Sequence, residues 1–290
     1  MKPAIYIFLI LFISISQATS PVEEEGNRLH RKAPLTTEQM LNVDIISYSG
    51  NFYLFPEETD LIYRLSLQYK ENPPVITYNR IGKRGYLSIK SRAHAQKDSD
   101  LFGQKEDEVD LTDQECELYI TPKIPLDLKM KFGVVQGEME LGGLQLQHLE
   151  FKAGVSKLWV RFSDPNPIAL ERIRIQAGVG KLKLSALGNA NFRYLEFDGG
   201  IGSSILDFSG NFQQHAQLKF NVGIGKVILK LPRTVGIRIK INKSFLSSVA
   251  IDNVYKRNGY YYNENWGNSN ASMDIQINTG IGRVVIQWVD

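Results

Sequence analysis

An aromatic cluster near the C-terminus is the most conspicuous candidate for a binding surface. Its members are Tyr260, Tyr261, Tyr262 and Trp266. The preceding pair Asn258-Gly259 is typical of a two-residue hairpin turn, so the tyrosines are expected to begin a strand. Neighbouring residues of a strand face opposite sides, so at least one tyrosine should be exposed. The cluster therefore predicts either a stacking platform for a carbohydrate or protein partner, or an aromatic cap over the end of the fold.

Paired glycines recur along the chain and invite comparison with a phosphate-binding loop. They are Gly178/Gly180, Gly200/Gly202, Gly223/Gly225 and Gly280/Gly282. A phosphate-binding loop needs its glycines to open a helix, whose first amides hold the anion. Strand-like alternation follows each pair here, so the glycines predict sharp chain corners and no nucleotide cofactor.

Residues that bind metals or act as nucleophiles are few and scattered. The histidines are His30, His94, His148 and His215. None has a partner at the spacing of a metal motif, so each is expected on the surface or in a loop, and no metal site is predicted. Cys116 is the single cysteine, so it has no disulfide partner within the chain. It is expected to be a half-buried small apolar residue.

Two carboxylates, Asp198 and Asp207, are close enough in sequence to consider glycoside hydrolysis. That chemistry needs two carboxylates that face each other at a defined separation. Alternation places Asp198 outward, and Asp207 follows nine residues later without a matching column of acids. The sequence therefore predicts no catalytic residue, and an enzyme that acts on polysaccharide is kept as an alternative.

The elements that carry these residues repeat along the chain. One template, small–Gly–apolar–Gly–polar–apolar–any–apolar, covers VVQGEMEL (134–141), AGVSKLWV (153–160), AGVGKLKL (177–184), GGIGSSIL (199–206), VGIGKVIL (222–229) and TGIGRVVI (279–286). The second glycine position recurs every 19–24 residues and then after 57. A period of about 20–25 residues is typical of a solenoid. The long last gap predicts one or two eroded units plus an insertion.

Alternation within each unit indicates how the unit folds. In the second unit Leu149 and Phe151 share the inner face. After the corner, Leu158 and Val160 point inward while Trp159 points outward. Each unit is then a strand, a Gly-x-Gly corner and a second strand, and stacked neighbours bury its apolar side. The predicted fold is an all-β, single-stranded β-solenoid with a smaller β region stacked at its N-terminal end.

The N-terminus has the pattern of an export signal. Lys2 precedes an apolar run from Ala4 to Ile15, and the small residues that follow suit cleavage near Ala18. The run is shorter than the roughly 20 residues of a membrane-spanning helix, so membrane association is expected only if the signal stays uncleaved. The sequence therefore predicts an extracytoplasmic protein, which is periplasmic, at the cell surface or secreted.

These segments together predict a division of the chain. It comprises a signal peptide at 1–18, a linker at 19–42, an N-terminal β domain at 43–124 with an acidic loop at 97–113, and a repeat domain at 125–290 with a C-terminal aromatic cap. The net charge of +3 is too balanced for a nucleic-acid-binding protein. A content of 43% hydrophobic residues excludes a wholly disordered chain.

Several of these segments resemble a known family. The stretch from Pro125 to Phe162, PLDLKMKFGVVQGEMELGGLQLQHLEFKAGVSKLWVRF, is similar to the start of the repeat region in the bacterial toast-rack family of exported proteins. The motifs GVGKLKL, GGIGSSILDFSG and GIGKVILKLP resemble that family and the LiaF-type cell-wall-antibiotic-response proteins. The stretch VDIISYSGNFYLFPEETDLIYRLSLQY, followed by PPVITYNRIGKRGYLSIKS, resembles the family's N-terminal domain. The resemblance covers about Val43 to Asp290 and implies a cell-envelope protein built on a β-solenoid, with no catalytic residue carried over.

The expected function is that of a non-enzymatic scaffold, adhesin or ligand-binding module of the cell envelope. The export signal, the solenoid pattern and the scattered chemistry-bearing residues support this expectation. An envelope glycan or an envelope protein is the expected partner, without a cofactor and without nucleic acid. A regulatory role in an envelope stress response is a further alternative, which the resemblance alone suggests.

Overall fold

The computed structural model describes residues 23–70, 72–91 and 114–290. The predicted signal peptide (1–18) and the acidic loop (97–113) lie outside these residues. Within the described ranges, no helix is long and apolar enough to cross a membrane.

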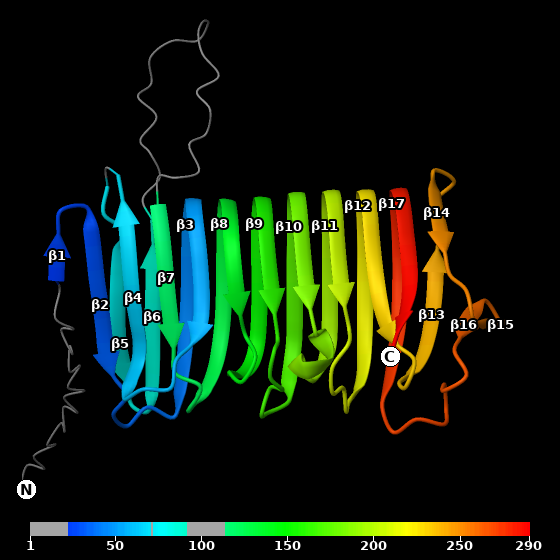
Figure 1. The fold of residues 1–290 in the computed structure, drawn as a ribbon, viewed down its shortest axis with the longest axis horizontal. Helices are drawn as coiled ribbons and strands as arrows, with labels where there is room; N and C mark the ends of the chain where they lie inside the picture. The colour runs from blue at the N-terminus through cyan, green and yellow to red at the C-terminus, as the bar shows by residue number, and fades with distance from the viewer. Residues whose placement is uncertain (1–22, 71, 92–113) are drawn as a thin grey trace, which may run out of the picture.

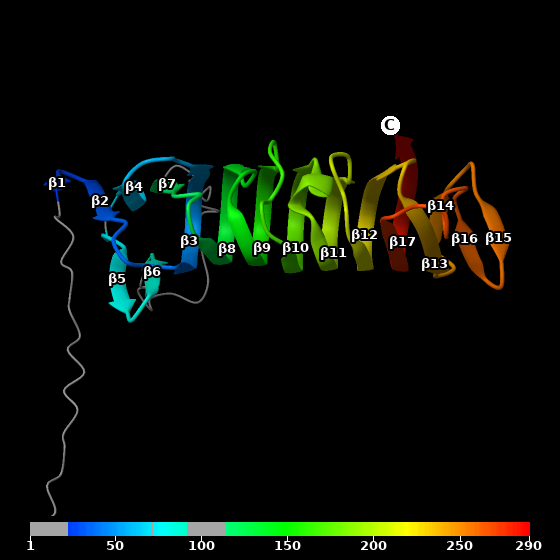
Figure 2. The same cartoon turned by 90° about the horizontal axis from the view of Figure 1, so that it is seen from below.

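Long strands stacked side by side form the body of the molecule (Figure 1). Each has 16–18 residues and pairs in parallel with the next strand of the row. In spatial order they are β3 (Met40–Pro56), β8 (Pro125–Glu140), β9 (Gln145–Arg161), β10 (Leu170–Ser185), β11 (Phe192–Asp207), β12 (His215–Pro232) and β17 (Ser272–Val289). We call each of these strands, with its loop, a rung. Their stacking along one axis confirms the predicted all-β solenoid (Figure 2).

The rungs of β9–β12 and β17 bend at the predicted corner. Gly180 has φ of 130°, and a Cβ added to it would lie 2.0 Å from the carbonyl oxygen of Ser156 on the preceding rung. Gly178 is as tightly placed, since its added Cβ would lie 2.2 Å from the carbonyl oxygen of Gly154. Glycine is therefore required at Gly180 by backbone conformation and by the close approach of the neighbouring rung, and at Gly178 by the close approach alone.

In β8 the predicted position of the corner is wrong by two residues, because Val135 lies opposite Ser156 of β9 and Gly137 lies opposite Leu158. A shift of two residues keeps the same face inward, so alternation could not distinguish the two registers.

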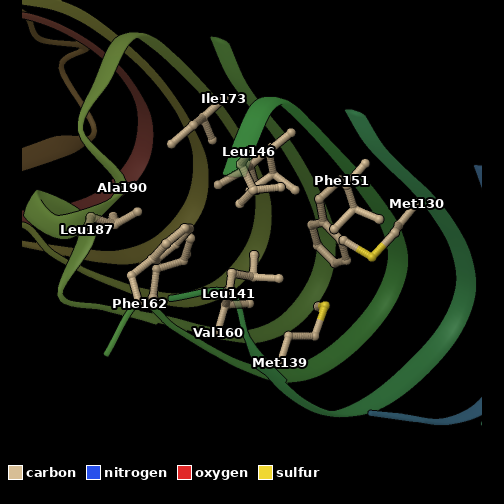
Figure 3. Packing of buried hydrophobic residues seen from close by; sticks show 14 of the residues in the cluster. Met130, Met139, Leu141, Leu146, Phe151, Val160, Phe162, Ile173, Leu187 and Ala190 are labelled. Atoms are coloured by element: carbon tan, nitrogen blue, oxygen red, sulfur yellow. The ribbon is translucent and has the colours of Figure 1, made fainter. Parts of the chain in front are cut away.

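The two halves of a bent strand enclose the core. Phe151 and Leu149 lie before the corner of β9, Leu158 and Val160 lie after it, and all four are buried. Figure 3 shows Met130 and Phe151 on one side of the enclosed space, and Met139 and Val160 on the other. One cluster of buried residues runs through all rungs. Because each such side chain contributes about 1.5–3 kcal/mol when fully buried, the stack gains stability with each added rung.

Side-chain amides hold the loops that connect one rung to the next. Asn166 lies in the loop after β9 and is buried. Its side chain accepts a hydrogen bond from the backbone amide of Leu146 at 2.9 Å and donates one to the Leu146 carbonyl at 2.8 Å. A short 3-10 helix, η1 (Leu187–Ala190), forms the next connection. The loops are therefore fixed to the stack rather than left without polar partners.

The smaller β region stacks on the N-terminal end, as predicted. Its strands are β1 (Glu23–Glu25), β2 (Arg28–Pro34), β4 (Leu61–Tyr69), β5 (Val75–Ile81), β6 (Arg84–Lys90) and β7 (Gln114–Ile120). The first half of β3 pairs in parallel with β6, and its second half pairs in parallel with β7. Two separate strands thus take the place of one bent strand next to β3. Since β3 itself pairs with β8, the region continues the stack.

The linker predicted at 19–42 is wrong for part of its length. Strand β2 lies within it and pairs antiparallel with β4. Leu29 and Ala33 of β2 are buried in the core. The apolar positions are too few and too widely spaced among the charged residues of RLHRKAP to indicate a strand by alternation. The division between residues 124 and 125 stays a prediction, because the paired strands β3 and β8 share one core across it.

The C-terminal strand does not lie at the end of the stack. Strand β17 pairs with β12 on one edge and with β13 (Gly236–Asn242) and β14 (Ser247–Ala250) on the other. Figure 1 shows β17 in red between β12 and the pair β13–β14. The long gap between the last two copies of the template therefore holds one split rung, formed by β13 and β14, as the spacing allowed. This outer rung lies beyond β17 in the stack. The chain passes the position of β17, forms the outer rung and then returns to fill the space.

Candidate functional site

The predicted aromatic cluster lies in the insertion that follows the outer rung. Strands β15 (Tyr255–Arg257) and β16 (Tyr260–Tyr262) form an antiparallel hairpin. Its turn residues Asn258 and Gly259 both have positive φ, 50° and 79°, which is the geometry of a type I′ turn. Strand β16 pairs with β13, so the hairpin covers the free edge of the outer rung.

The tyrosines of β16 divide between two faces. Tyr261 packs against the core, whereas Tyr260 and Tyr262 lie on the other face, with ring centroids 6.2 Å apart. Trp266 joins this second face, 6.0 Å from Tyr262. The guanidinium of Arg238 lies 5.1 Å from the Tyr260 ring and 4.9 Å from the Trp266 ring, within the range of a cation–π contact. All four aromatic residues are half-buried, so the choice between cap and binding platform stays a prediction.

A buried asparagine that sequence reasoning missed positions this segment. Asn263 accepts a hydrogen bond from the backbone amide of Ile237 at 2.8 Å and donates one to the carbonyl of Val235 at 2.8 Å. It repeats the role of Asn166, where one amide side chain satisfies a backbone donor and a backbone acceptor. The signal in the sequence was an asparagine after a strand, which is too common to single out.

Cys116 lies deeper than expected. It is buried in β7 rather than half-buried, and burial raises the pKa of its thiol to about 12. A thiol that stays protonated at neutral pH is a poor nucleophile, so the geometry favours a packing role for this residue.

The histidines do not gather around a common point. His148 Nδ1 lies 2.7 Å from Asp127 Oδ1 of the neighbouring rung, and His215 Nδ1 lies 2.9 Å from Ser272 Oγ. His30 is exposed on β2, and His94 lies outside the described residues. In residues 23–70, 72–91 and 114–290, no three histidine, cysteine or carboxylate side chains come close enough to hold a metal.

The two candidate glycosidase carboxylates point to opposite sides of the rod. Asp198 precedes the corner of β11 and Asp207 follows it, and both face outward. Asp198 accepts a hydrogen bond from Asn221 at 2.6 Å, and Asp207 lies 3.5 Å from the ammonium of Lys230. The two carboxylates therefore do not face a common substrate position, which agrees with the outward placement expected for Asp198.

The outer surface before the corners, which we call the first-half face, is internally paired. Acids and bases alternate from rung to rung along one column of the stack. Lys129 lies 3.6 Å from Glu150, and Glu196 lies 3.2 Å from both Arg174 and Lys219. The next column is a ladder of amides around Asp198. Charge on this face is largely compensated within the protein.

The outer surface after the corners, which we call the second-half face, differs in charge. On β9–β12 and β17 it carries the cations Lys157, Arg161, Lys181, Lys183, Lys226, Lys230 and Arg283. Its one acid on these strands is Asp207, which pairs with Lys230, while Arg161 pairs with Glu140 of β8. Within the described ranges the other cations form no ion pair, and Lys157 instead lies 5.4 Å from the Trp159 ring. From β9 to β17 this face is therefore basic, and most of its cations are uncompensated.

An exposed aliphatic ridge borders the second-half face. It consists of the apolar residue between the two glycines of each corner: Val155, Val179, Ile201, Ile224 and Ile281, each 46–53% exposed. The glycines bring these residues to the outside of the bend. Stacked neighbours cover about half of each side chain, so the ridge packs against itself along the axis.

Two solved structures have a similar arrangement. A crystal structure of a candidate cell adhesion protein from Clostridium sporogenes ATCC 15579 is 17% identical, with a TM-score of 0.47 over 90% of this chain and 99% of that chain. A crystal structure of a candidate adhesin from Bacteroides fragilis NCTC 9343 is 12% identical, with a TM-score of 0.36 over 90% of this chain and 98% of that chain. No curated protein matches the sequence.

A family match covers the stacked N-terminal region and the first rungs. The model described as the N-terminal domain of toast_rack, DUF2154, matches residues 18–185, which is more than half of the chain. It extends from before β2 to the end of β10 and so includes the first two of the paired glycines, Gly178 and Gly180. The chain therefore belongs to the toast-rack family.

Proposed function

We propose that this protein is a non-enzymatic binding scaffold of the cell envelope that holds an extended anionic polymer, such as an acidic polysaccharide, on its second-half face. The observation that carries the proposal is the charge difference between the two faces of one rod. On the first-half face Lys129, Arg174 and Lys219 have acidic partners on neighbouring rungs. On the second-half face Lys181, Lys183 and Lys226 have none within the described part of the chain. A partner with negative charges would compensate them.

The geometry of the stack suits a linear partner. Lys157, Lys181, Lys226 and Arg283 occupy equivalent positions on successive rungs, with Ser203 between the second and third. Neighbouring rungs are about 4.8 Å apart, so the cations form a straight row along the axis. Because the backbone of each rung is fixed by its neighbours, the spacing of the cations along the row is set before a ligand arrives, and this lowers the entropic cost of binding.

The envelope location rests on the predicted export signal. An exported rod with a basic face would meet acidic surface polysaccharides. The scattered chemistry-bearing residues support binding without turnover over the alternative, a solenoid enzyme that acts on polysaccharide.

The test compares two double variants with equal net charge. Lys181→Glu with Lys226→Glu reverses two unpaired cations of the second-half face. The matched control, Lys131→Glu with Lys243→Glu, reverses two exposed cations elsewhere, for which the described residues contain no ion pair. Retention on immobilised polygalacturonate is measured with increasing salt, and neutral dextran serves as the reference matrix. We expect retention of the wild type and the control, and at least about a tenfold weaker affinity of the second-half variant, or 1.4 kcal/mol.

Three results would contradict this function. Equal losses in both double variants would show that net charge, and not the second-half face, controls retention. Equal retention on DNA at the same salt concentration would show only general attraction to polyanions. Release of shortened polygalacturonate would support the polysaccharide-degrading alternative instead.

A further inference from the structure

A groove opens at the N-terminal end of the first-half face, whereas the basic surface lies on the second-half face. It has a volume of about 570 Å³, which is within the range of small-molecule sites. Its floor is formed by outward residues of β3, β8 and β9, and its wall by the hairpin of β5 and β6. Figure 2 shows β5 and β6 set below the line of the rungs, where they border this face. The hairpin therefore makes a concave surface of an otherwise flat sheet.

Strand pairing arranges the polar residues of the groove in two rows. The first row contains Asn79, Tyr86, Asn42, Asp127 and His148. The second row contains Thr77, Ser88, Asp44, Lys129 and Glu150. Each row crosses five paired strands about 4.8 Å apart, so it extends for about 19 Å along the axis of the rod. A ligand that fits the rows is elongated.

The residue types in the rows match a polyhydroxylated ligand. Carboxylate oxygens accept hydrogen bonds, side-chain amides both donate and accept, and the hydroxyls of Thr77 and Ser88 do both. Tyr86 adds an aromatic ring that is 38% exposed and lies on the wall. An exposed ring beside hydrogen-bonding groups can pack on the apolar side of a sugar while its neighbours bind the hydroxyls.

Two polar atoms of the groove residues lack a protein partner. Asp44 Oδ1 and Asn42 Nδ2 are buried, and neither has a hydrogen bond within the described residues. They come from the same face of β3, one an acceptor and the other a donor. Buried groups without partners are rare, because the cost of removing each from water is not compensated by a hydrogen bond. The side chains of both residues line the groove and are half-buried, so a hydroxyl in the groove meets a carboxylate that accepts and an amide that donates.

The other charges of the groove are already engaged. Glu150 lies 3.6 Å from the ammonium of Lys129 and 3.1 Å from that of Lys152. Asp127 contacts His148 at 2.7 Å. Asp44 is thus the one carboxylate among the described groove residues without an ion pair. A polycation would need several free carboxylates, so these contacts favour an uncharged ligand.

We propose that this groove binds a neutral oligosaccharide, with Tyr86 stacking on a sugar ring and Asp44 and Asn42 binding a hydroxyl. The site is separate from the basic second-half face and from the aromatic hairpin at the other end of the rod. It gives the scaffold a second ligand class, recognised by hydrogen bonds and stacking rather than by charge.

Binding is measured by titration calorimetry and by saturation-transfer NMR with cellotetraose and chitotetraose as probes and spermine as the cationic comparison. We expect binding of at least one tetrasaccharide to the wild type. Tyr86→Ala should weaken it by about tenfold or more, whereas Tyr86→Phe, which keeps the ring, should stay within about twofold. Asp44→Asn should weaken it by about fivefold, because hydrogen bonds to a charged acceptor are stronger.

The control variants lie outside the groove. Tyr194→Ala removes an outward aromatic residue of the same column on β11, and Asp198→Asn removes an outward carboxylate of the same face. Both should bind the tetrasaccharide as the wild type does, and thermal melts verify the fold of every variant. The Lys181→Glu, Lys226→Glu protein should also bind it unchanged, which separates this proposal from the polymer-binding function. Binding of spermine alone, binding of neither tetrasaccharide, or equal effects of groove and control variants would overturn the proposal.

Discussion

Neighbouring rungs can stack closely at their corners because the corner residues are glycines, which have no Cβ. At Gly202 an added Cβ would lie 2.0 Å from the carbonyl oxygen of Gly180, and at Gly225 it would lie 2.0 Å from that of Gly202. A side chain at one corner would therefore separate two rungs, and the separation would extend to the core behind them. The same corner exposes the apolar residue between its glycines, so one local geometry explains both the repeated glycines and the aliphatic ridge.

Substitution of one corner glycine should show this effect. Gly202 has a φ of 138°, and the neighbouring rung leaves no room for a methyl group at this position. We therefore expect Gly202→Ala to lower the free energy of unfolding by about 3 kcal/mol or more. Gly267→Ala is the control, because its φ of 83° is also positive but nothing lies within 4 Å of an added Cβ. The control should cost only about 1–2 kcal/mol. Urea denaturation measures both, and equal costs would show that conformation alone, without the contact between rungs, accounts for the glycine.

Strand β16 shows how an element can serve two purposes. Its pairing with β13 protects an edge that would otherwise present unpaired backbone groups. Alternation then turns Tyr261 to the core, while Tyr260 and Tyr262 join Trp266 and Arg238 on the outer side. The inner face of the strand thus packs on the core, and the outer face carries a half-buried aromatic cluster.

The three tyrosines should therefore differ in their contribution to stability. Tyr261→Ala removes a ring packed on the core, and we expect it to cost at least about 1 kcal/mol more than Tyr260→Ala or Tyr262→Ala. Thermal melts of the three single variants measure the difference. Three similar shifts in melting temperature would contradict the division of β16 into two faces. Conversely, binding lost in Tyr260→Ala but kept in Tyr261→Ala would assign a ligand to the outer cluster.

Much of the solenoid is predictable because its signals are local. The glycine corner and the alternation around Leu149 and Leu158 lie within one rung, so the sequence predicts the shape of the rung directly. The groove is different: Asp127 meets His148 from another rung, and Tyr86 comes from a hairpin that only the folded chain brings there. Such contacts depend on which strands are neighbours and in which register, and short patterns do not encode this. Strand β2 was not predicted for the same reason: its residues are buried only because the strand pairs with β4, which lies far from it in the sequence.

At the scale of the whole molecule, the order of the last strands departs from the order of the chain. Sequential addition would place β13 directly on β12, but β17 occupies that position. The apolar pattern of β17 follows the same template as β12, and both match through every position of the corner. A full rung of matching shape is thus inserted between β12 and the shorter split rung. The inserted strand covers the long edge of β12 more completely than β13 and β14 could, because it pairs along its whole length.

A chain that ends at Ala271 should test this arrangement. Without β17, strand β13 keeps only its short pairing with β16, while β9 and β10 keep all their neighbours. We therefore expect backbone amides of β13 and β16 to lose protection in hydrogen exchange, and those of β9 and β10 to stay protected as in the full chain. Exchange followed by mass spectrometry on both proteins measures each segment separately, and β9 and β10 serve as the internal control for folding. If β13 stayed protected, it would have paired with β12 without help from β17. The inserted strand would then be dispensable for the outer rung, contrary to the order seen in the stack.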